Sequence, residues 1–499
     1  MALKSYSAGA EPKFPSTYDV TKRVTLNFTD IISNSNKFYN TEVQVAKSGE
    51  ARIYTCYGRT GGTQAKEYRV CDNQSHAEIE CDKIIKSKIK KGYVEVKLAK
   101  ADVGSDVGKA KIEVSVTVEA AKKAGVKFEE ADDTKSSLHP EVKDLVRTWF
   151  GVTQDFIDLN LDTKKCALGQ LSLDQLNKGR DILDEARKII HLKKPDIDEL
   201  NKLTNSYYSN IPHNFGYTRI NADTLRLDND IKVDAALDML DVFQDAKNVE
   251  KVISKKSNID SQYSTLNADL NWLDPSDPTW KWIDAMLHET KAPNHHFLGK
   301  LKTHKIFKVS RNGEESIFIN NAESIAKECK KQIIPQTYSK FVKSRPDISK
   351  ELMPLYKQAN ILPGWHGTRR ANMIGITTRG FLIHPGAGVV TAGAMYGSGI
   401  YLASNSTKSI NYCDVKGSYW AKGNNRTAYL YLVDAAFGEM KLVSSSGSYS
   451  KNSIKPHHSV FAQAGKGGVI NDEMIIYNQT GISQQHVIRY IIEFETLVN

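Results

Sequence analysis

The 499-residue sequence predicts a multidomain α+β protein, and three observations support this prediction. The chain is longer than one ordinary domain, since single hydrophobic cores rarely grow beyond about 250 to 300 residues. The spacing of apolar residues alternates near the N-terminus, follows a helical period in the middle of the chain and is mixed afterwards. Hydrophobic residues make up 40% and charged residues 25%, which is typical of a folded globular protein.

The N-terminal part is predicted to be a small β-rich domain over residues 24–116, preceded by a flexible tail over residues 1–23. Its apolar and β-branched runs are separated by Asn, Gly and Ser, and one helix is expected over His76–Ile89. The strand candidates are Val24–Phe28, Phe38–Val45, Ala51–Tyr57 and Tyr93–Leu98. Residues 117–137 carry Ala, Lys, Glu and Asp without an apolar stripe and are predicted to be a linker.

A helical domain is predicted over residues 138–262, because apolar residues there recur at helical spacing. The first such stripe consists of Val142, Leu145, Val146, Trp149 and Phe150. Pro140 fits a first helical turn, where its missing amide hydrogen costs nothing, and Ser172 is expected to cap the next helix.

The last domain, residues 263–499, is expected to be mixed α+β, because its strand candidates are irregularly spaced. They are Lys305–Val309, Gly399–Ala403, Ala428–Asp434, Met474–Tyr477 and Val487–Phe494. No Gly-x-Gly-x-x-Gly opens a helix after a strand and no Gly-Lys-Ser/Thr phosphate loop occurs, so a nucleotide site here would not be a Rossmann crevice.

Charge and cysteine content restrict the partners and the compartment. A net charge of +10 favours a polyanionic partner, although a charge spread over this length also fits a solubility feature. The six cysteines contain no Cys-x-x-Cys pair, so no zinc module, no other metal site and no disulfide framework is expected, and a reducing compartment fits best. Without an apolar run of about 20 residues or a secretion signal, the chain is expected to be intracellular and to stay off membranes.

Three short motifs in the last domain point to chemistry. His366 lies beside a glycine in residues 362–369, Tyr401 follows a Gly-Ser-Gly in residues 396–403, and Glu473 opens an apolar run in residues 471–477. Taken alone, each also fits packing: a structural histidine, a hairpin with core tyrosines, or an exposed cap before a strand. Together they match the cleavage of a cationic N-glycoside, which needs a flat ring pocket, hydroxyl contacts and a carboxylate facing an oxocarbenium-like transition state.

These motifs resemble the poly(ADP-ribose) polymerase family. Trp-His-Gly-Thr-Arg (365–369), Tyr-Gly-Ser-Gly-Ile-Tyr (396–401) and Asp-Glu-Met-Ile-Ile-Tyr (472–477) are similar to its three catalytic motifs in the same order. Leu-Gly-Gln-Leu-Ser (168–172) and Ile-Pro-His-Asn-Phe-Gly (211–216) resemble landmarks of its helical regulatory domain, and Tyr-Gly-Arg (57–59) lies where its WGR domain carries the Trp-Gly-Arg signature. The resemblance implies an NAD-consuming ADP-ribosyltransferase that acts in the DNA damage response.

The resemblance also implies a role for each motif residue. His366 would bind a ribose hydroxyl of NAD, Tyr401 would form one wall of the nicotinamide pocket, and Glu473 would stabilise the developing cation and help deprotonate the acceptor. The other implied contacts are Gly367 and Ser409 with the carboxamide, Tyr412 stacked on the ring, Thr368 and Asn372 towards the adenosine, and Lys408 on the acceptor side.

In the N-terminal domain, the resemblance implies binding to DNA ends that carry a 5′-phosphate, by a chain that is monomeric when free of DNA. Tyr57 replaces the signature tryptophan, and the implied contacts are Tyr57, Arg59 and the lysine cluster Lys86, Lys88, Lys90 and Lys91. A solvated basic helix surface is the alternative. The implied location is the nucleus in a eukaryote and the nucleoid-containing cytoplasm in a bacterium.

Two departures from the family pattern leave the product open. Leu382 lies where an arginine is expected near the adenine, and the segment from Val460 to Glu473 is short. A glutamate at position 473 resembles the polymer-forming members, which modify themselves and other proteins. A mono-ADP-ribosyltransferase with the same pocket, and a DNA-end-binding scaffold with an inactive transferase domain, are the alternatives.

Overall fold

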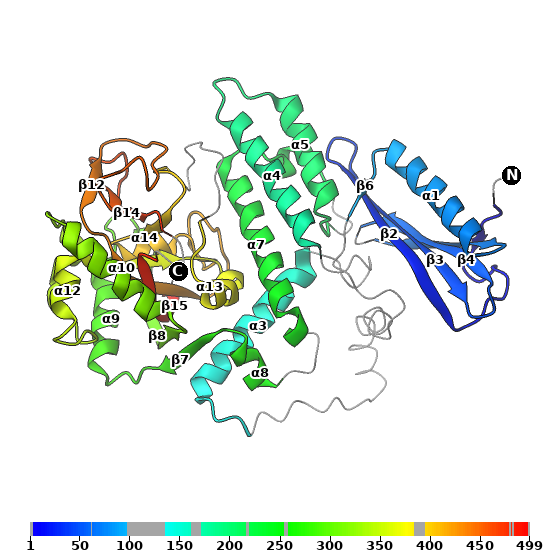
Figure 1. The fold of residues 1–499 in the computed structure, drawn as a ribbon. Helices are drawn as coiled ribbons and strands as arrows, with labels where there is room; N and C mark the ends of the chain where they lie inside the picture. Colours follow the sequence, from blue (N-terminus) through cyan, green and yellow to red (C-terminus); the bar gives the residue numbers. More distant parts are fainter. Residues whose placement is uncertain are drawn as a thin grey trace. The chain divides into compact units, whose positions relative to one another are not determined.

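A computed structural model describes residues 3–60, 62–96, 135–160, 171–215, 219–253, 258–383, 395–478, 481 and 484–497 (Figure 1). The chain divides into two compact units. One comprises residues 1–130 and 154–247, and the other comprises residues 131–153 and 248–499. Among the described residues, no helix combines the length and the apolar character that crossing a membrane requires. The mixed α+β architecture agrees with the prediction from the sequence.

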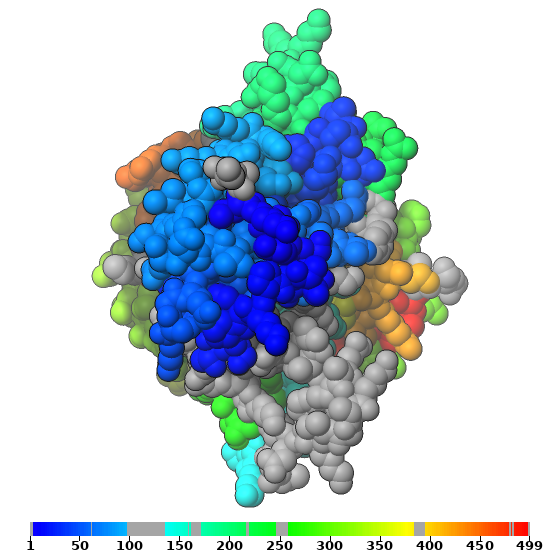
Figure 2. Space-filling model, turned by 90° about the vertical axis from the view of Figure 1, so that its right-hand side faces the viewer, coloured from blue at the N-terminus to red at the C-terminus, as the bar shows by residue number. Residues whose placement is uncertain are grey.

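The first unit begins with a six-stranded antiparallel sheet in the order β1-β5-β4-β3-β2-β6. Its strands are β1 (Tyr6–Ser7), β2 (Tyr18–Asp30), β3 (Ser35–Ala46), β4 (Ala51–Arg59), β5 (Gln64–Cys71) and β6 (Val94–Glu95). One helix, α1 (Gln74–Lys90), lies along the sheet and buries Ala77, Cys81 and Ile85 (Figure 1). Asn73 caps this helix by accepting a hydrogen bond from the backbone N–H of His76. Figure 2 shows, in blue, the surface that these N-terminal residues form.

The predicted helix and the first three predicted strands of this domain are confirmed. Of the strand predicted over Tyr93–Leu98, only Val94–Glu95 is a strand, and residues 97–98 lie outside the described residues. The prediction of a flexible tail over residues 1–23 is wrong at two places: β1 pairs with β5, and β2 already starts at Tyr18 and pairs along its length with β3. The sequence prediction also missed β5, in which charged residues interrupt the apolar alternation.

Helices form the rest of the first unit. The helices of this region are α3 (Pro140–Asn160), α4 (Leu173–Ile190), α5 (Ile197–Asn210), α6 (Ala222–Leu225) and α7 (Asp230–Ile253). Pro140 opens α3 and Ser172 caps α4, as predicted. Helices α4, α5 and α7 lie side by side in Figure 1 and share a core that includes Leu183, Tyr207 and Leu240. The landmark residues 168–170 and 216 and most of the predicted linker lie outside the described residues.

Helix α3 is divided between the two units. Its first half buries Val142, Leu145 and Trp149 in the core of the second unit, where the Trp149 ring meets Tyr429 edge-on at 5.7 Å. Its second half packs in the first unit, where Phe156 lies 6.3 Å from Phe243 between ring centroids. The boundary between the two compact units therefore falls inside the helical domain predicted over residues 138–262.

The second unit contains two sheets. One has five antiparallel strands in the order β7-β8-β15-β11-β9. The other has four strands in the order β10-β14-β13-β12, of which β12 and β13 pair in parallel and the other pairs are antiparallel. The strands are β7 (Ala268–Trp272), β8 (Lys300–Arg311), β9 (Ile361–Gly367), β10 (Ile400–Leu402), β11 (Thr427–Ala436), β12 (Met440–Val443), β13 (Ser459–Ala462), β14 (Glu473–Ile476) and β15 (His486–Leu497). All five predicted strands of this domain are present, whereas β7, β9, β12 and β13 were missed.

Short helices cover the two sheets. They are α8 (Ile259–Ser264), α9 (Pro278–Glu289), α10 (Glu314–Glu328), α11 (Ser339–Lys343), α12 (Met353–Gln358), α13 (Met373–Arg379) and α14 (Ser406–Ile410), with 3-10 turns at His296–Leu298, Gln336–Tyr338 and Arg370–Asn372. A buried ion cluster joins this layer to the sheet, since Asp434 on β11 accepts hydrogen bonds from Arg345, Arg489 and Tyr356 at 2.8 to 3.1 Å. Burial alone would raise the pKa of Asp434, but the two guanidinium groups hold it below its ordinary value.

Candidate active site

Three neighbouring strands bring the predicted catalytic residues together. Trp365 on β9 and Ala403, just after β10, exchange backbone hydrogen bonds of 2.9 and 3.0 Å, which places the two strands side by side. Strand β10 also pairs with β14, with Tyr401 opposite Ile475. His366, Tyr401 and Glu473 therefore come from three adjacent strands, although 107 residues separate the first from the last (473 − 366).

His366 is neutral and has a fixed tautomer. Its Nδ1 lies 3.1 Å from the Tyr401 carbonyl oxygen. Because a carbonyl can only accept, Nδ1 carries the hydrogen and Nε2 keeps a lone pair for a ligand hydroxyl. Burial lowers the pKa of His366 to about 4, and the bond to Tyr401 only partly offsets this. The ring of Phe381 packs edge-on against the imidazole at 4.4 Å and restricts its rotation.

Glu473 is a buried carboxylate paired with a lysine. Its Oε1 lies 2.5 Å from Nζ of Lys408, and the residue is only 9% exposed. The interpretation of Glu473 as an exposed strand cap is therefore wrong. Asp472 fixes the turn in front of it, since the Asp472 carboxylate accepts from the Ala464 backbone N–H at 2.8 Å and from the Ser404 hydroxyl at 3.2 Å.

The Tyr401 side chain is held at its hydroxyl. This group donates to the Gly397 carbonyl and accepts from the Tyr396 backbone N–H, both at 2.8 Å. Burial raises the pKa of Tyr401, and the nearby Glu473 carboxylate raises it further. Gly397 has φ of +84°, and a Cβ there would lie 2.0 Å from the Tyr449 carbonyl oxygen, so only glycine fits this turn.

Gly367 ends β9 directly against α14. A Cβ on Gly367 would lie 1.8 Å from the backbone oxygen of Ser409, which makes glycine obligatory for this close approach. The Ser409 hydroxyl donates to the Trp365 carbonyl at 2.8 Å, so its oxygen retains acceptor capacity. The two residues predicted to hold the carboxamide are therefore neighbours.

The residues predicted to face the adenosine form a second, buried polar pair. Asn372 Nδ2 donates to the Thr368 hydroxyl at 3.1 Å. Asn372 Oδ1 is buried and has no hydrogen-bond partner among the described residues, which leaves an acceptor for a ligand. Leu382, which the resemblance places near the adenine, is 38% exposed.

Tyr412 lies at the rim of the site and is 36% exposed. Its ring is nearly parallel to that of Trp420, with a centroid separation of 6.4 Å and an interplanar angle of 20°. Stacking of Tyr412 on a nicotinamide ring stays a prediction.

The sequence prediction missed a polar group beside the Lys408–Glu473 pair. The Asn471 side-chain amide lies 3.2 Å from His295 Nε2, His295 Nδ1 lies 3.1 Å from the Thr407 hydroxyl, and Lys408 donates to the Asn471 carbonyl at 3.3 Å. Burial and the charge of Lys408 lower the pKa of His295. No local pattern signals His295, because it lies 176 residues from Asn471 in the chain.

In the N-terminal sheet, the predicted DNA-binding residues have different surroundings. The Tyr57 ring stacks on Tyr39 at 5.4 Å and its hydroxyl donates to Glu67 at 2.7 Å. Arg59 donates to the carbonyl and side-chain oxygens of Asn34 at 3.0 and 3.2 Å.

The predicted DNA-binding lysines of α1 differ in how exposed they are. Lys88 lies over the Tyr39 ring at 4.0 Å, and burial and the nearby Lys91 charge lower its pKa. Lys86, Lys90 and Lys91 are exposed. Of the predicted cations on this helix, these three are therefore the ones that solvent reaches most freely.

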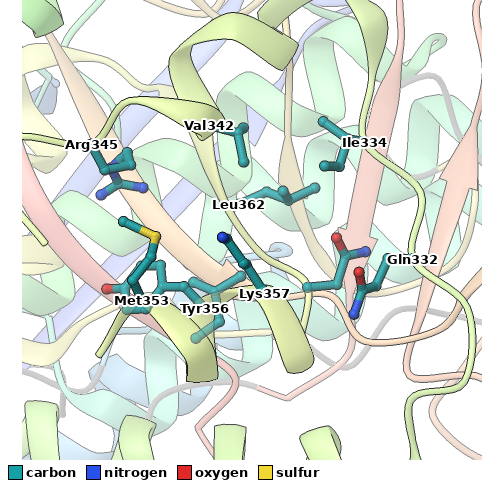
Figure 3. A pocket seen from close by; sticks show the side chains of 10 residues that line it. Gln332, Ile334, Val342, Arg345, Met353, Tyr356, Lys357 and Leu362 are labelled. Atoms are coloured by element: carbon teal, nitrogen blue, oxygen red, sulfur yellow. The ribbon is translucent and has the colours of Figure 1, made fainter. Parts of the chain in front are cut away.

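A hollow of about 400 Å³ lies elsewhere in the second unit, and no predicted site residue lines it (Figure 3). Its walls include Val342, Met353 and Leu362, and the guanidinium of Arg345 there already pairs with Asp347 and Asp434. Among the described residues, no group of three His, Cys, Asp or Glu side chains could hold a metal ion.

Three family models match the chain. The model described as WGR domain matches residues 22–100, the poly(ADP-ribose) polymerase regulatory domain matches 136–271, and the poly(ADP-ribose) polymerase catalytic domain matches 279–495. The chain belongs to the poly(ADP-ribose) polymerase family. Its C-terminal part, residues 279–495, matches the catalytic domain of that family.

Individual relatives are distant. "Poly [ADP-ribose] polymerase 2-A" of Oryza sativa subsp. japonica is 24% identical over 83% of this chain and 57% of its own length, and "Poly [ADP-ribose] polymerase" of Sarcophaga peregrina is 26% identical over 88% and 40%. The human "Protein mono-ADP-ribosyltransferase PARP3" is 26% identical over 88% of this chain and 76% of its own length. The chain thus spans about half the length of the first two relatives.

Proposed function

We propose that this chain transfers ADP-ribose from NAD+ to protein acceptors, itself included, and releases nicotinamide. The observation that carries the proposal is the convergence of neutral His366, Tyr401 and the Lys408-paired Glu473 on three adjacent strands. The family match supports the same chemistry.

In this reaction the bond between the ribose C1′ and the nicotinamide nitrogen breaks. The bonding electrons leave with nicotinamide, which becomes neutral, and positive charge develops on the ribose. An acceptor nucleophile then bonds to C1′ and loses a proton. The carboxylate of Glu473 stabilises the developing cation and orients a ribose hydroxyl, and it helps to take up the acceptor proton.

The other side chains bind and orient NAD+. His366 Nε2 accepts from a ribose hydroxyl, since Nδ1 is committed to Tyr401. Ser409 Oγ accepts from the carboxamide, since its own hydrogen is committed to Trp365. The unpartnered Oδ1 of Asn372 accepts from the adenosine half. Lys408 lies on the acceptor side and forms an ion pair with the Glu473 carboxylate.

We further propose that the product is a polymer and that DNA ends with a 5′-phosphate activate the enzyme, as part of a DNA damage response. The glutamate at position 473 favours polymer formation, and the match to the WGR domain together with exposed Lys86 and Lys90 favours binding to DNA phosphates. Mono-transfer is the second candidate, because one relative is named a mono-ADP-ribosyltransferase. For a eukaryotic source, the location that fits this role is the nucleus.

The test follows incorporation of labelled NAD+ into the wild type and Glu473→Gln, with and without duplex DNA carrying 5′-phosphorylated ends. A DNA-stimulated high-mass smear that shrinks to a discrete band in the variant is the expected result. A discrete band in both proteins would mean mono-transfer. No incorporation and no nicotinamide release from either protein would contradict the proposed activity and favour a DNA-binding scaffold.

A further inference from the structure

His295 joins the two chain segments that carry the Lys408–Glu473 ion pair. Its Nδ1 lies 3.1 Å from the hydroxyl of Thr407, the residue before Lys408 on α14. Its Nε2 lies 3.2 Å from the side-chain amide of Asn471, two residues before Glu473. The imidazole therefore bridges α14 to the turn before β14, and none of the roles predicted for the site uses it.

The hydrogen positions in this bridge follow from its partners. The Asn471 amide nitrogen can only donate, so Nε2 of His295 accepts and Nδ1 carries the hydrogen. The Thr407 oxygen accepts that hydrogen and also accepts from the Ala292 backbone N–H at 2.8 Å. Burial and the charge of Lys408 lower the pKa of His295, which favours the neutral ring that this arrangement requires.

The two bridged segments are anchored unequally. On α14, the Ser406 hydroxyl donates to the Leu287 carbonyl at 2.7 Å, and the Ser409 hydroxyl donates to a backbone carbonyl of β9 at 2.8 Å. By contrast, the Asn471 side chain has no hydrogen-bond partner other than His295 in the part of the chain that the structure describes. Loss of the imidazole should therefore free Asn471 rather than α14.

Asn471 in turn contacts the ion pair. Its backbone carbonyl accepts from Nζ of Lys408 at 3.3 Å, and the same Nζ lies 2.5 Å from Oε1 of Glu473. Movement of Asn471 therefore displaces an oxygen bound to Lys408 and also the chain that leads into Glu473.

We propose that His295 is a positioning residue, which holds Asn471 and thereby the ion pair in the geometry that ADP-ribose transfer needs. The inference rests on the proposed transferase function. Because Glu473 faces charge that develops only during the reaction, its misplacement should slow the reaction step more than it weakens NAD+ binding. The hydrogen bond proposed between His366 and NAD+ does not pass through His295.

This role predicts a loss in kcat rather than a rise in KM. His295→Ala removes the acceptor of the Asn471 amide, and kcat should fall by about 3- to 10-fold, the equivalent of one net hydrogen bond. KM for NAD+ should stay within about twofold. Asn471→Ala removes the same contact from the other end but keeps the carbonyl that Lys408 uses, so it should have the same effect. The double variant should be no slower than either single variant, since both remove one interaction.

The experiment measures initial rates of nicotinamide release from NAD+ by the full chain, with and without 5′-phosphorylated duplex DNA. It compares wild type, His295→Ala, His295→Gln, Asn471→Ala and the double alanine variant, with His296→Ala as the matched control on an exposed neighbouring histidine. The side-chain oxygen of glutamine can accept from Asn471, so His295→Gln should keep kcat within about twofold of wild type. If thermal unfolding shows that His295→Ala does not fold, Asn471→Ala, which keeps the imidazole, tests the same contact.

The outcomes separate this inference from the proposed function. Slower turnover at unchanged KM in both single alanine variants, with no further loss in the double variant, supports the role. Additive losses, unchanged kcat in either alanine variant, an equal loss in His296→Ala, or a His295→Gln protein as slow as His295→Ala would each overturn the inference alone. A wild-type protein that releases no nicotinamide would contradict the transferase function itself, and with it the inference.

Discussion

Replacing Gly367 by alanine tests the close approach on which the predicted carboxamide site depends. The added Cβ would lie 1.8 Å from the Ser409 carbonyl oxygen and 2.6 Å from its carbon, whereas ordinary contacts begin near 3.4 Å. The two segments must therefore separate by about 1.6 Å, the difference between 3.4 and 1.8 Å. Both sides of the contact are backbone, so no flexible side chain can absorb the overlap.

Two separate costs follow from this displacement. Overpacking of this kind destabilises by about 1 to 3 kcal/mol. At about 2 to 4 °C per kcal/mol for a large domain, the melting temperature should fall by roughly 2 to 12 °C. Misplacement of substrate-holding groups by about 1 Å costs about 100-fold in rate. Activity should therefore fall far more than the modest loss of stability explains.

The assay combines thermal unfolding with labelled NAD+ incorporation, and Gly151→Ala is the matched control. Gly151 lies in α3 with no atom within 4 Å of an added Cβ, so alanine there should be neutral or stabilising by up to about 1 kcal/mol. A Gly367→Ala protein with wild-type melting temperature and incorporation within twofold would refute the steric reasoning.

A pair of substitutions and a change of pH probe the buried ionisable groups of the same unit. Asp434→Asn leaves Arg345 and Arg489 without their shared carboxylate, and it should cost about 3 to 5 kcal/mol in urea unfolding. Glu315 also pairs with Arg489 but is half-exposed, so Glu315→Gln should lower the free energy of unfolding by only about 1 kcal/mol or less. Equal losses from Asp434→Asn and Glu315→Gln would contradict the buried-cluster argument. Lowering the pH from 6.5 to 5 should also destabilise the unit, because His366 and His486, with pKa values of about 4 and 3, stay neutral when folded but become protonated when unfolded. Each should cost roughly 2 kcal/mol over that window, and a flat stability profile from pH 6.5 to 5 would exclude this linkage.

Local patterns singled out three residues that the structure brings onto adjacent strands, and their catalytic roles stay predictions. His366, Tyr401 and Glu473 lie in short motifs that each also fit packing, and only their combination points to chemistry. The convergence of three strands could not be derived from them, because it depends on the Trp365–Ala403 bridge and on the pairing of β10 with β14.

Strand β9 shows why part of the fold was missed. It contains Pro363 and Gly364, which lower strand propensity, yet it carries His366. The strand is tolerated because it lies at the edge of its sheet, where a proline need not donate to a neighbouring strand. Contacts such as that of His295 with Asn471 were equally hidden, since only the tertiary fold joins residues so far apart in the chain.

The packing of helix α3 determines which deletion can test whether the helical region restrains the enzyme until DNA binds. Local opening of residues 138–256 on DNA binding is our hypothesis for activation, and removing that region should then abolish the need for DNA. However, the first half of α3 supplies Val142, Leu145, Val146, Trp149 and Phe150 to the core of the second unit. Losing five buried apolar side chains, at about 2 to 5 kcal/mol each, costs about 10 to 25 kcal/mol, which is comparable to or greater than the typical stability of a domain of about 5 to 15 kcal/mol.

A deletion of residues 138–256 should therefore yield an unfolded transferase domain rather than an unrestrained one. Excising residues 154–247 with a short Gly-Ser bridge removes only the part that belongs to the first unit and leaves the Trp149 contact with Tyr429 intact. We expect this shorter excision to give a soluble protein whose labelled NAD+ incorporation is the same with and without DNA. A soluble, well-folded protein from the longer deletion would contradict the role of α3 in the second core, and a folded short excision that still requires DNA would contradict the restraint itself.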